Sequence, residues 1–129
     1  MEKLFVPYEI AKQLKEKGFD ELCFRYYNVK DYDLPLYYQN DLSLEGEDFN
    51  DIKYEKIGQI SAPLYQQVMD WFRRKHKIHI EIMSPPKNGD WHYVLYKINE
   101  TPPIGRSEST HYLYDDAIDT AIKEALKLI

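Results

Sequence analysis

The sequence predicts a single small α+β domain over residues 1–129, and three observations support this prediction. A chain of 129 residues has the size of one domain. Apolar residues recur with helical spacing between residues 64 and 72, and they alternate with polar residues between 78 and 82. Patterns of these two kinds follow one another in the order α-β-(β)-α-β-β-α. This order, with about three helices, is typical of helices packed on one face of a small, mainly antiparallel sheet.

The first helix is predicted over about residues 7–17. Gly18 follows it and supplies the left-handed residue that commonly ends a helix. Phe19 then stands where a Schellman motif packs a hydrophobic residue back on the helix, here on Leu14. The aromatic, alternating run at 21–27 predicts a strand directly after this helix.

An acidic loop is predicted over about residues 28–51, where carboxylates are interleaved with turn formers. Short strands are expected near 36–39 and near 52–57. The acidic stretch 41–51 lacks the full EF-hand pattern of alternating ligands, central glycine and closing glutamate, so a solvated loop is the better explanation.

The second half of the chain predicts a helix, a hairpin and a last helix. Ser61 is expected to cap the second helix, which ends near Lys75. Strands at 78–82 and 94–98 form the hairpin around a loop at 84–90. The last helix carries a stripe of small and aliphatic residues, which predicts close packing on a sheet, on another helix or in a homodimer. This stripe comprises Ala117, Ile118, Ala121, Ile122, Ala125, Leu126 and Ile129.

The charge and the hydropathy of the chain limit which kinds of partner it is expected to bind. Residues 1–60 carry 8 basic and 13 acidic residues, a net charge of −5, whereas residues 61–129 carry 9 of each. A general attraction to nucleic acid or anionic lipid is therefore not indicated. No apolar run approaches the roughly 20 residues that cross a bilayer, and the N-terminus lacks the pattern of a signal peptide. We expect a cytoplasmic protein without a membrane partner.

No motif in the sequence indicates catalysis or a cofactor. Cys23 is the only cysteine and stands in an apolar run, which favours a packed thiol over a nucleophile. His76 and His79 have an HxxH spacing, but they fall on a helix–strand junction, where helical spacing brings no ligands together. Asp115 and Asp116 suit the first turn of a helix. We therefore predict no catalytic, cofactor-binding or metal-binding residues, and the sequence favours a protein that is not an enzyme. A small hydrolase or nuclease would need carboxylates and histidines that converge in one pocket.

One basic cluster stands out, and it comprises Arg73, Arg74, Lys75 and Lys77. Cations at the C-terminus of a helix stabilise it through the helix dipole, which is one explanation of the cluster. The other is a nucleic-acid contact supported by neighbouring aromatic side chains. The chain also has 12 tyrosines, which serve equally as core residues and as interface residues.

Three stretches of the chain, at 5–21, 61–80 and 114–126, resemble a group of small uncharacterised proteins carried by prophages and mobile elements of gut Bacteroidetes. The quoted motifs include Phe5-Val6-Pro7-Tyr8 and Ser61-Ala62-Pro63-Leu64, and the acidic loop lies outside the similarity. The resemblance implies a mobile-element accessory protein in a bacterial cytoplasm, and it assigns no activity, cofactor or site.

These observations favour a non-enzymatic accessory or protein-interaction protein of phage type. Its binding surface is expected among exposed tyrosines, the acidic loop or the basic end of the second helix. The alternative is a nucleic-acid-binding module that uses Arg73, Arg74, Lys75 and Lys77.

Overall fold

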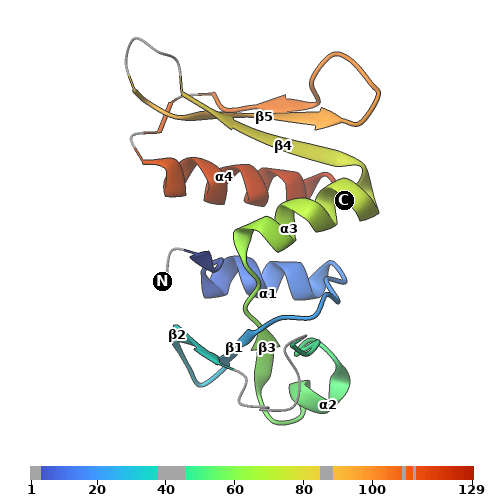
Figure 1. The fold of residues 1–129 in the computed structure, drawn as a ribbon, viewed down its shortest axis with the longest axis vertical. Coiled ribbons are helices and arrows are strands. Elements are labelled where there is room, and N and C mark those ends of the chain that lie inside the picture. Colours follow the sequence, from blue (N-terminus) through green and yellow to red (C-terminus); the bar gives the residue numbers. More distant parts are fainter. Residues whose placement is uncertain (1–3, 38–45, 85–88, 109, 112) are drawn as a thin grey trace. The chain divides into compact units, whose positions relative to one another are not determined.

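The computed structural model describes residues 4–37, 46–84, 89–108, 110–111 and 113–129, and of residues 31–37 it describes the backbone alone. The fold has helices and antiparallel strands in the α+β arrangement that the sequence predicts (Figure 1). Contacts along the chain divide it into two compact units, residues 1–68 and 69–129. Each unit contains one antiparallel sheet, so the predicted strands belong to two sheets.

The first unit contains a three-stranded sheet with β1 at its centre, between β2 and β3. Helix α1 packs on β3. The elements are α1 (Tyr8–Glu16), β1 (Arg25–Asn28), β2 (Asp31–Tyr37), α2 (Ile52–Glu55) and β3 (Gln59–Ser61).

Helix α1 ends as the sequence predicts. Gly18 has a positive φ of 88°, and the backbone N–H of Phe19 donates to the carbonyl of Leu14 over 3.0 Å. This bond is the long one of a Schellman motif. Phe19 and Leu14 are both buried.

Two predictions in the segment after β1 are wrong. Residues 31–37 lie within the expected acidic loop, yet their backbone forms β2 and pairs with β1. Residues 52–55 form the short helix α2 in place of the strand expected near 52–57. The cause is local, because the Asp51 side chain accepts a hydrogen bond from the backbone N–H of Lys53 over 3.0 Å and so caps a helix. Residues 38–45 of the expected loop lie outside the described part of the chain.

The sequence predicts that Ser61 caps the second helix, and this prediction is wrong. Ser61 is the last residue of β3. Its side chain is fully buried, and its hydroxyl oxygen accepts a hydrogen bond from the backbone N–H of Phe49 over 3.0 Å. The helix α3 (Tyr65–Trp71) begins four residues later. There the Gln67 side chain accepts from the backbone N–H of Leu64, so a different residue takes the capping role.

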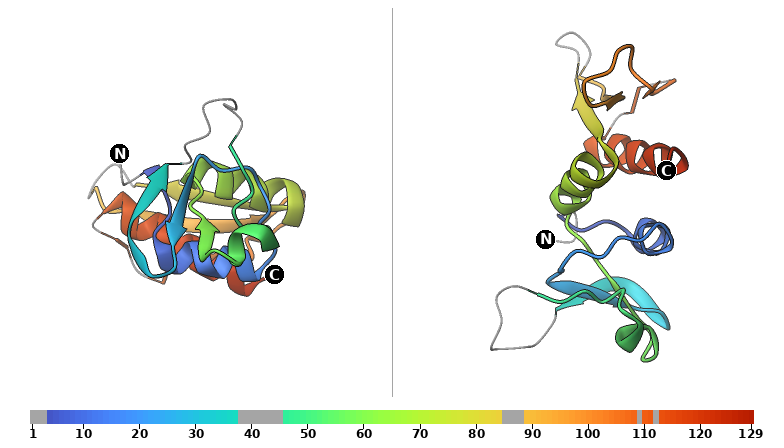
Figure 2. Two further views of the ribbon diagram at one scale, coloured as in Figure 1. Left: turned by 90° about the horizontal axis from the view of Figure 1, so that it is seen from below. Right: turned by 90° about the vertical axis from the view of Figure 1, so that its right-hand side faces the viewer.

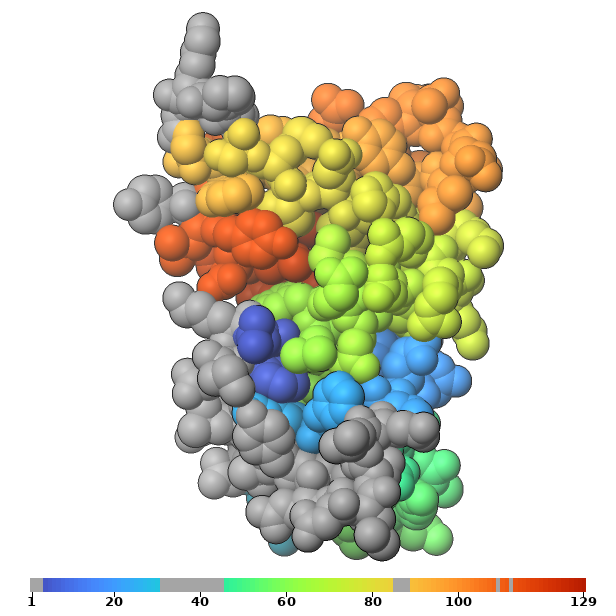
Figure 3. Space-filling model, viewed as in Figure 1, coloured from blue at the N-terminus to red at the C-terminus, as the bar shows by residue number. Residues whose placement is uncertain are grey.

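The second unit contains the sheet β4-β5-β6, all antiparallel, with helix α4 on one face (Figure 2). In the space-filling view the red atoms of α4 lie directly against the yellow atoms of β4 (Figure 3). A π-helical turn, η2 (Phe72–His76), continues α3 and leads into β4 through Lys77, whose φ is 58°. The other elements are β4 (Ile78–Met83), β5 (His92–Lys97), β6 (Gly105–Arg106) and α4 (Tyr114–Lys127).

The predicted hairpin is confirmed, and its register shows which residues face α4. Ile80 lies opposite Leu95 and Ile82 lies opposite Tyr93. Directly opposite residues share a face of a sheet, so the apolar face of β4 continues through Tyr93 and Leu95 of β5. The apolar stripe of α4 from Ala117 to Leu126 is buried, and α4 packs on both strands. None of the described helices combines the length and hydropathy that a bilayer crossing requires.

Candidate functional site

The sheet of the second unit has an outer face, opposite α4, that carries chemically diverse side chains. Side chains alternate between the two faces of a strand. Since Ile80 and Leu95 face α4, their neighbours in sequence face the other way. The outer face therefore comprises His79, Glu81, Met83, His92, Val94, Tyr96 and Arg106.

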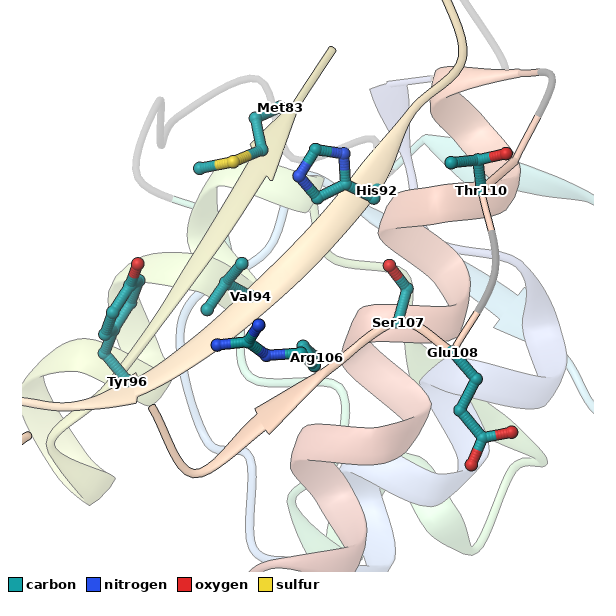
Figure 4. A pocket seen from close by; sticks show the side chains of 8 residues that line it. All are labelled: Met83, His92, Val94, Tyr96, Arg106, Ser107, Glu108 and Thr110. Carbon is teal, nitrogen blue, oxygen red and sulfur yellow. The ribbon is translucent and has the colours of Figure 1, made fainter. Parts of the chain in front are cut away.

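A hollow of about 420 Å³ lies on this outer face (Figure 4). Val94 contributes apolar surface and is only 9% exposed, and Met83 and Tyr96 add a thioether and an aromatic ring. Such a mixture of apolar surface and a few polar groups is typical of ligand-binding sites. The lining residues are Met83, His92, Val94, Tyr96, Arg106, Ser107, Glu108 and Thr110.

Arg106 is the charged group best placed to bind a ligand in the hollow. It lies opposite Val94 in the β5–β6 pair, and its side chain extends from β6 toward Tyr96 (Figure 4). The carboxylate of Glu108 points away from the other labelled side chains in that view. Among the described residues, no carboxylate forms an ion pair with the Arg106 guanidinium.

Two hydroxyl groups of the hollow are held in place by hydrogen bonds. Ser107 accepts one from the backbone N–H of Tyr93 over 3.2 Å. Thr110 donates one to the carboxylate of Asp90 over 3.3 Å. These bonds link Ser107 to β5 and Thr110 to Asp90, the residue that precedes Trp91.

The predicted basic cluster lies at the end of the helix, as the sequence indicates. Arg73 and Arg74 belong to η2, and Arg73 forms an ion pair with Asp70. Lys75 and Lys77 are exposed. The cluster thus contains cations that are available to a partner and at least one that is partly neutralised within the chain.

Folding adds Lys97 to this cluster. Lys97 lies opposite Ile78, the residue that follows Lys77. Burial lowers the pKa of His76, and the charges of Lys75 and Lys97 lower it further. The position of Lys97 beside the cluster could not be predicted from the sequence, because the hairpin separates it from Lys77 along the chain.

His76 is packed against aromatic side chains and is not placed as a ligand. Its ring lies edge-on to Trp71 with centroids 4.6 Å apart, and its Nε2 is buried without a hydrogen-bond partner among the described residues. His79 lies on β4 and stacks on Tyr96. In the part of the chain that is described, no three His, Cys, Asp or Glu side chains are grouped so that they could hold a metal ion.

Cys23 is buried, as the apolar run predicts. Burial is the main cause that raises the pKa of its thiol to about 12. A thiol with such a pKa stays protonated at neutral pH, so it has no nucleophilic character. Asp115 and Asp116 lie in the first turn of α4, where the helix dipole favours acidic side chains.

Nothing in the sequence indicates the hollow, because its residues show no regular pattern. Arg106 belongs to a strand of two residues, which is too short for periodicity. Tyr93, Val94, Leu95 and Tyr96 are all apolar or aromatic, so alternation does not select a face of β5. Of the acidic stretch, residues 41–45 lie outside the described residues, and Glu47 is paired with the backbone of Cys23.

Compared with models of protein families, with curated proteins and with solved structures, the chain matches none. The chemistry of the surfaces described above is therefore the basis for a functional proposal.

Proposed function

We propose that the protein is a non-enzymatic accessory protein of phage type that acts by binding another protein, with the hollow on the outer face as the binding site. The observation that supports this proposal is the Arg106 guanidinium, which lies over an apolar surface without a carboxylate partner among the described residues. A guanidinium in such a place binds carboxylates through two parallel hydrogen bonds.

The chemistry of the hollow indicates what it would bind. Met83, Val94 and the ring of Tyr96 suit an aliphatic or aromatic side chain, and Arg106 suits an acidic one beside it. The volume of about 420 Å³ accommodates a few side chains of a peptide segment. We propose a partner segment with an Asp or Glu next to an apolar residue.

Selection from a random peptide library on the full-length protein tests this proposal. Selected peptides should share an acidic residue beside an apolar one. The Arg106→Gln variant should bind them roughly 10- to 100-fold more weakly, because a hydrogen bond to a charged group contributes about 1.5–3 kcal/mol. Lys123→Gln is the matched control, since it removes one exposed cation from α4, away from the outer face.

Two results would count against the proposal. One is the absence of any enriched peptide above background. The other is equal binding by the wild-type protein and the Arg106→Gln variant, with the same apparent affinity in both.

Binding of nucleic acid is a second candidate function, favoured by the addition of Lys97 to the basic cluster. Contacts of several cations with phosphates give an affinity that falls steeply with salt. Fluorescence anisotropy with single- and double-stranded DNA and RNA, at about 50 and 200 mM salt, measures this dependence. Replacement of Arg73, Arg74, Lys75 and Lys77 by alanine should abolish binding, and Lys97→Ala should weaken it. A flat anisotropy trace at the lower salt concentration would exclude this function.

A further inference from the structure

Among the residues that the structure describes, β4 is an outer strand of its sheet and pairs with β5 alone. Over its first five residues, Ile78–Ile82, isoleucines alternate with the polar side chains of His79 and Glu81. An unpaired strand edge presents a row of backbone donors and acceptors to which another strand can bind. This edge is independent of the binding function proposed above.

The hydrogen bonds of the sheet show which groups of β4 point outward. The backbone N–H of Ile98 donates to the carbonyl of Lys77 over 2.8 Å, so residue 77 faces β5. In an antiparallel ladder, alternate residues turn their N–H and C=O groups to the same side. Residues 79, 81 and 83 therefore also face β5, and Ile78, Ile80 and Ile82 point their backbone groups away from it.

A hydrogen bond between β5 and the segment before β6 independently shows that the backbone groups of Ile80 point to the free edge of β4. The carbonyl of Leu95 accepts from the backbone N–H of Ile104 over 2.9 Å, so Leu95 faces β6. Its opposite residue, Ile80, then directs its own backbone groups to the free edge of β4. Outside the ladders of the sheets, no backbone hydrogen bond in the described part of the chain involves the N–H of Ile78, Ile80 or Ile82.

We infer that two copies of the chain pair through β4, antiparallel and with Ile80 opposite Ile80 of the second copy. In this register Ile78 lies opposite Ile82, so isoleucines face isoleucines on the side that carries α4. On the outer face, His79 of each copy lies opposite Glu81 of the other. An imidazole N–H can donate a hydrogen bond to a carboxylate, so these two polar positions of the strand are complementary to each other, and the pair occurs twice.

Neighbouring registers lack this complementarity. A shift of one copy by two residues in one direction places Glu81 opposite Glu81, and the same shift in the other direction places His79 opposite His79. Like charges directly opposite each other destabilise a sheet, whereas opposite charges stabilise it. The register centred on Ile80 avoids the contact between two Glu81 carboxylates and gives each of them an imidazole partner.

A charge exchange tests the pairing. The wild-type protein should show dimers by light scattering after size exclusion over roughly 10 to 500 µM, since small interfaces form weak dimers. His79→Glu places two carboxylate pairs in the interface and should give a monomer. The double variant His79→Glu/Glu81→Lys places opposite charges across the interface and should dimerise again. Circular dichroism confirms that the monomeric variant remains folded.

A disulfide experiment tests the register. Opposite residues have Cβ atoms ~4.5–5.5 Å apart, close to the ~3.5–4.5 Å of a disulfide. A mixture of the His79→Cys and Glu81→Cys variants should therefore cross-link under oxidation with copper phenanthroline. Neither variant alone should do so, because the two copies of one position are displaced by about 7 Å along the strands. The buried Cys23 thiol does not interfere.

Three results would overturn the inference. These are a wild-type protein that stays monomeric at the highest concentration, a dimer that persists in His79→Glu, and a double variant that remains monomeric. Cross-linking of either cysteine variant by itself, at the rate of the mixture, would overturn the register.

Discussion

The cost of replacing a glycine depends on the atoms around it, and Gly46 is the clearest example in this chain. Its φ is 80°, and a Cβ at this position would meet the backbone carbonyl of Cys23, with 2.7 Å to the carbonyl carbon. Gly58 has a similar φ of 74° but no atom within 4 Å of such a Cβ. The two glycines therefore separate the cost of a left-handed backbone from the cost of a steric clash.

Alanine substitutions at these two glycines should differ in effect. Gly58→Ala should lower the free energy of unfolding by about 1 kcal/mol, the cost of the left-handed conformation. Gly46→Ala should lower it by about 2–4 kcal/mol, because the backbone of Cys23 must also move. Urea denaturation measures both values, and equal losses would show that the clash is relieved at no cost.

The buried thiol of Cys23 should make stability depend on alkaline pH. The thiol of the unfolded chain loses its proton near its ordinary pKa of 9.0, whereas burial raises the folded pKa to about 12. Between these values the unfolded chain binds fewer protons than the folded chain, so stability falls as the pH rises. The slope is about 1.4 kcal/mol per pH unit.

Denaturation of the wild-type protein and of Cys23→Ala between about pH 8 and pH 11 checks this. The free energy of unfolding of the wild-type protein should fall with rising pH more steeply than that of Cys23→Ala, by about 1.4 kcal/mol per pH unit. The titrations of tyrosine and lysine are common to both proteins and do not contribute to this difference. Parallel curves would show that the thiol titrates equally in both states.

At the scale of elements, local signals predicted the ends of α1 and the hairpin, and long-range contacts decided the rest. Gly18 and Phe19 end α1 by bonds within a few residues, so the sequence suffices there. The face of β5 depends on its pairing with β4, which no pattern within β5 reveals. Ser61 has the chemistry of a helix cap but satisfies a buried backbone group from elsewhere in the chain.

The turn η2 should make stability sensitive to mildly acidic pH through His76. Burial, followed by the charges of Lys75 and Lys97, lowers the folded pKa of this side chain below its ordinary value of 6.5. As the pH falls through about 6.5, the unfolded chain takes up a proton that the folded chain binds less readily, so stability is lost. His76→Phe keeps a ring against Trp71 and should remove this loss.

Thermal unfolding between about pH 5 and pH 8 compares the two proteins. The wild-type melting temperature should drop more than that of His76→Phe on acidification. An identical drop in both would place the responsible groups elsewhere in the chain.

At the scale of the whole molecule, the chain contains two units with their own sheets. In the second unit, the apolar stripe of α4 is buried against β4 and β5, so this unit has its own core. We therefore expect a fragment of residues 62–129 to fold by itself. It should be less stable than the full chain, because a domain of this size buries only about 60% of its unfolded surface.

Circular dichroism of this fragment should show helix and strand, and its thermal unfolding should be cooperative. A broad, non-cooperative melt would show that the second unit requires residues 1–61 to fold. The predicted single domain over residues 1–129 remains a prediction, and this experiment bears on it directly.

The left-handed conformation of Lys77 provides a way to separate charge from stability in the basic cluster. A lysine with a φ of 58° bears a steric cost of roughly 1–2 kcal/mol that glycine avoids, while its charge near a helix end contributes about 0.3–1 kcal/mol. Lys77→Gly thus removes a cation without weakening the fold. Any change in binding by that variant reports on charge alone, which few surface substitutions allow.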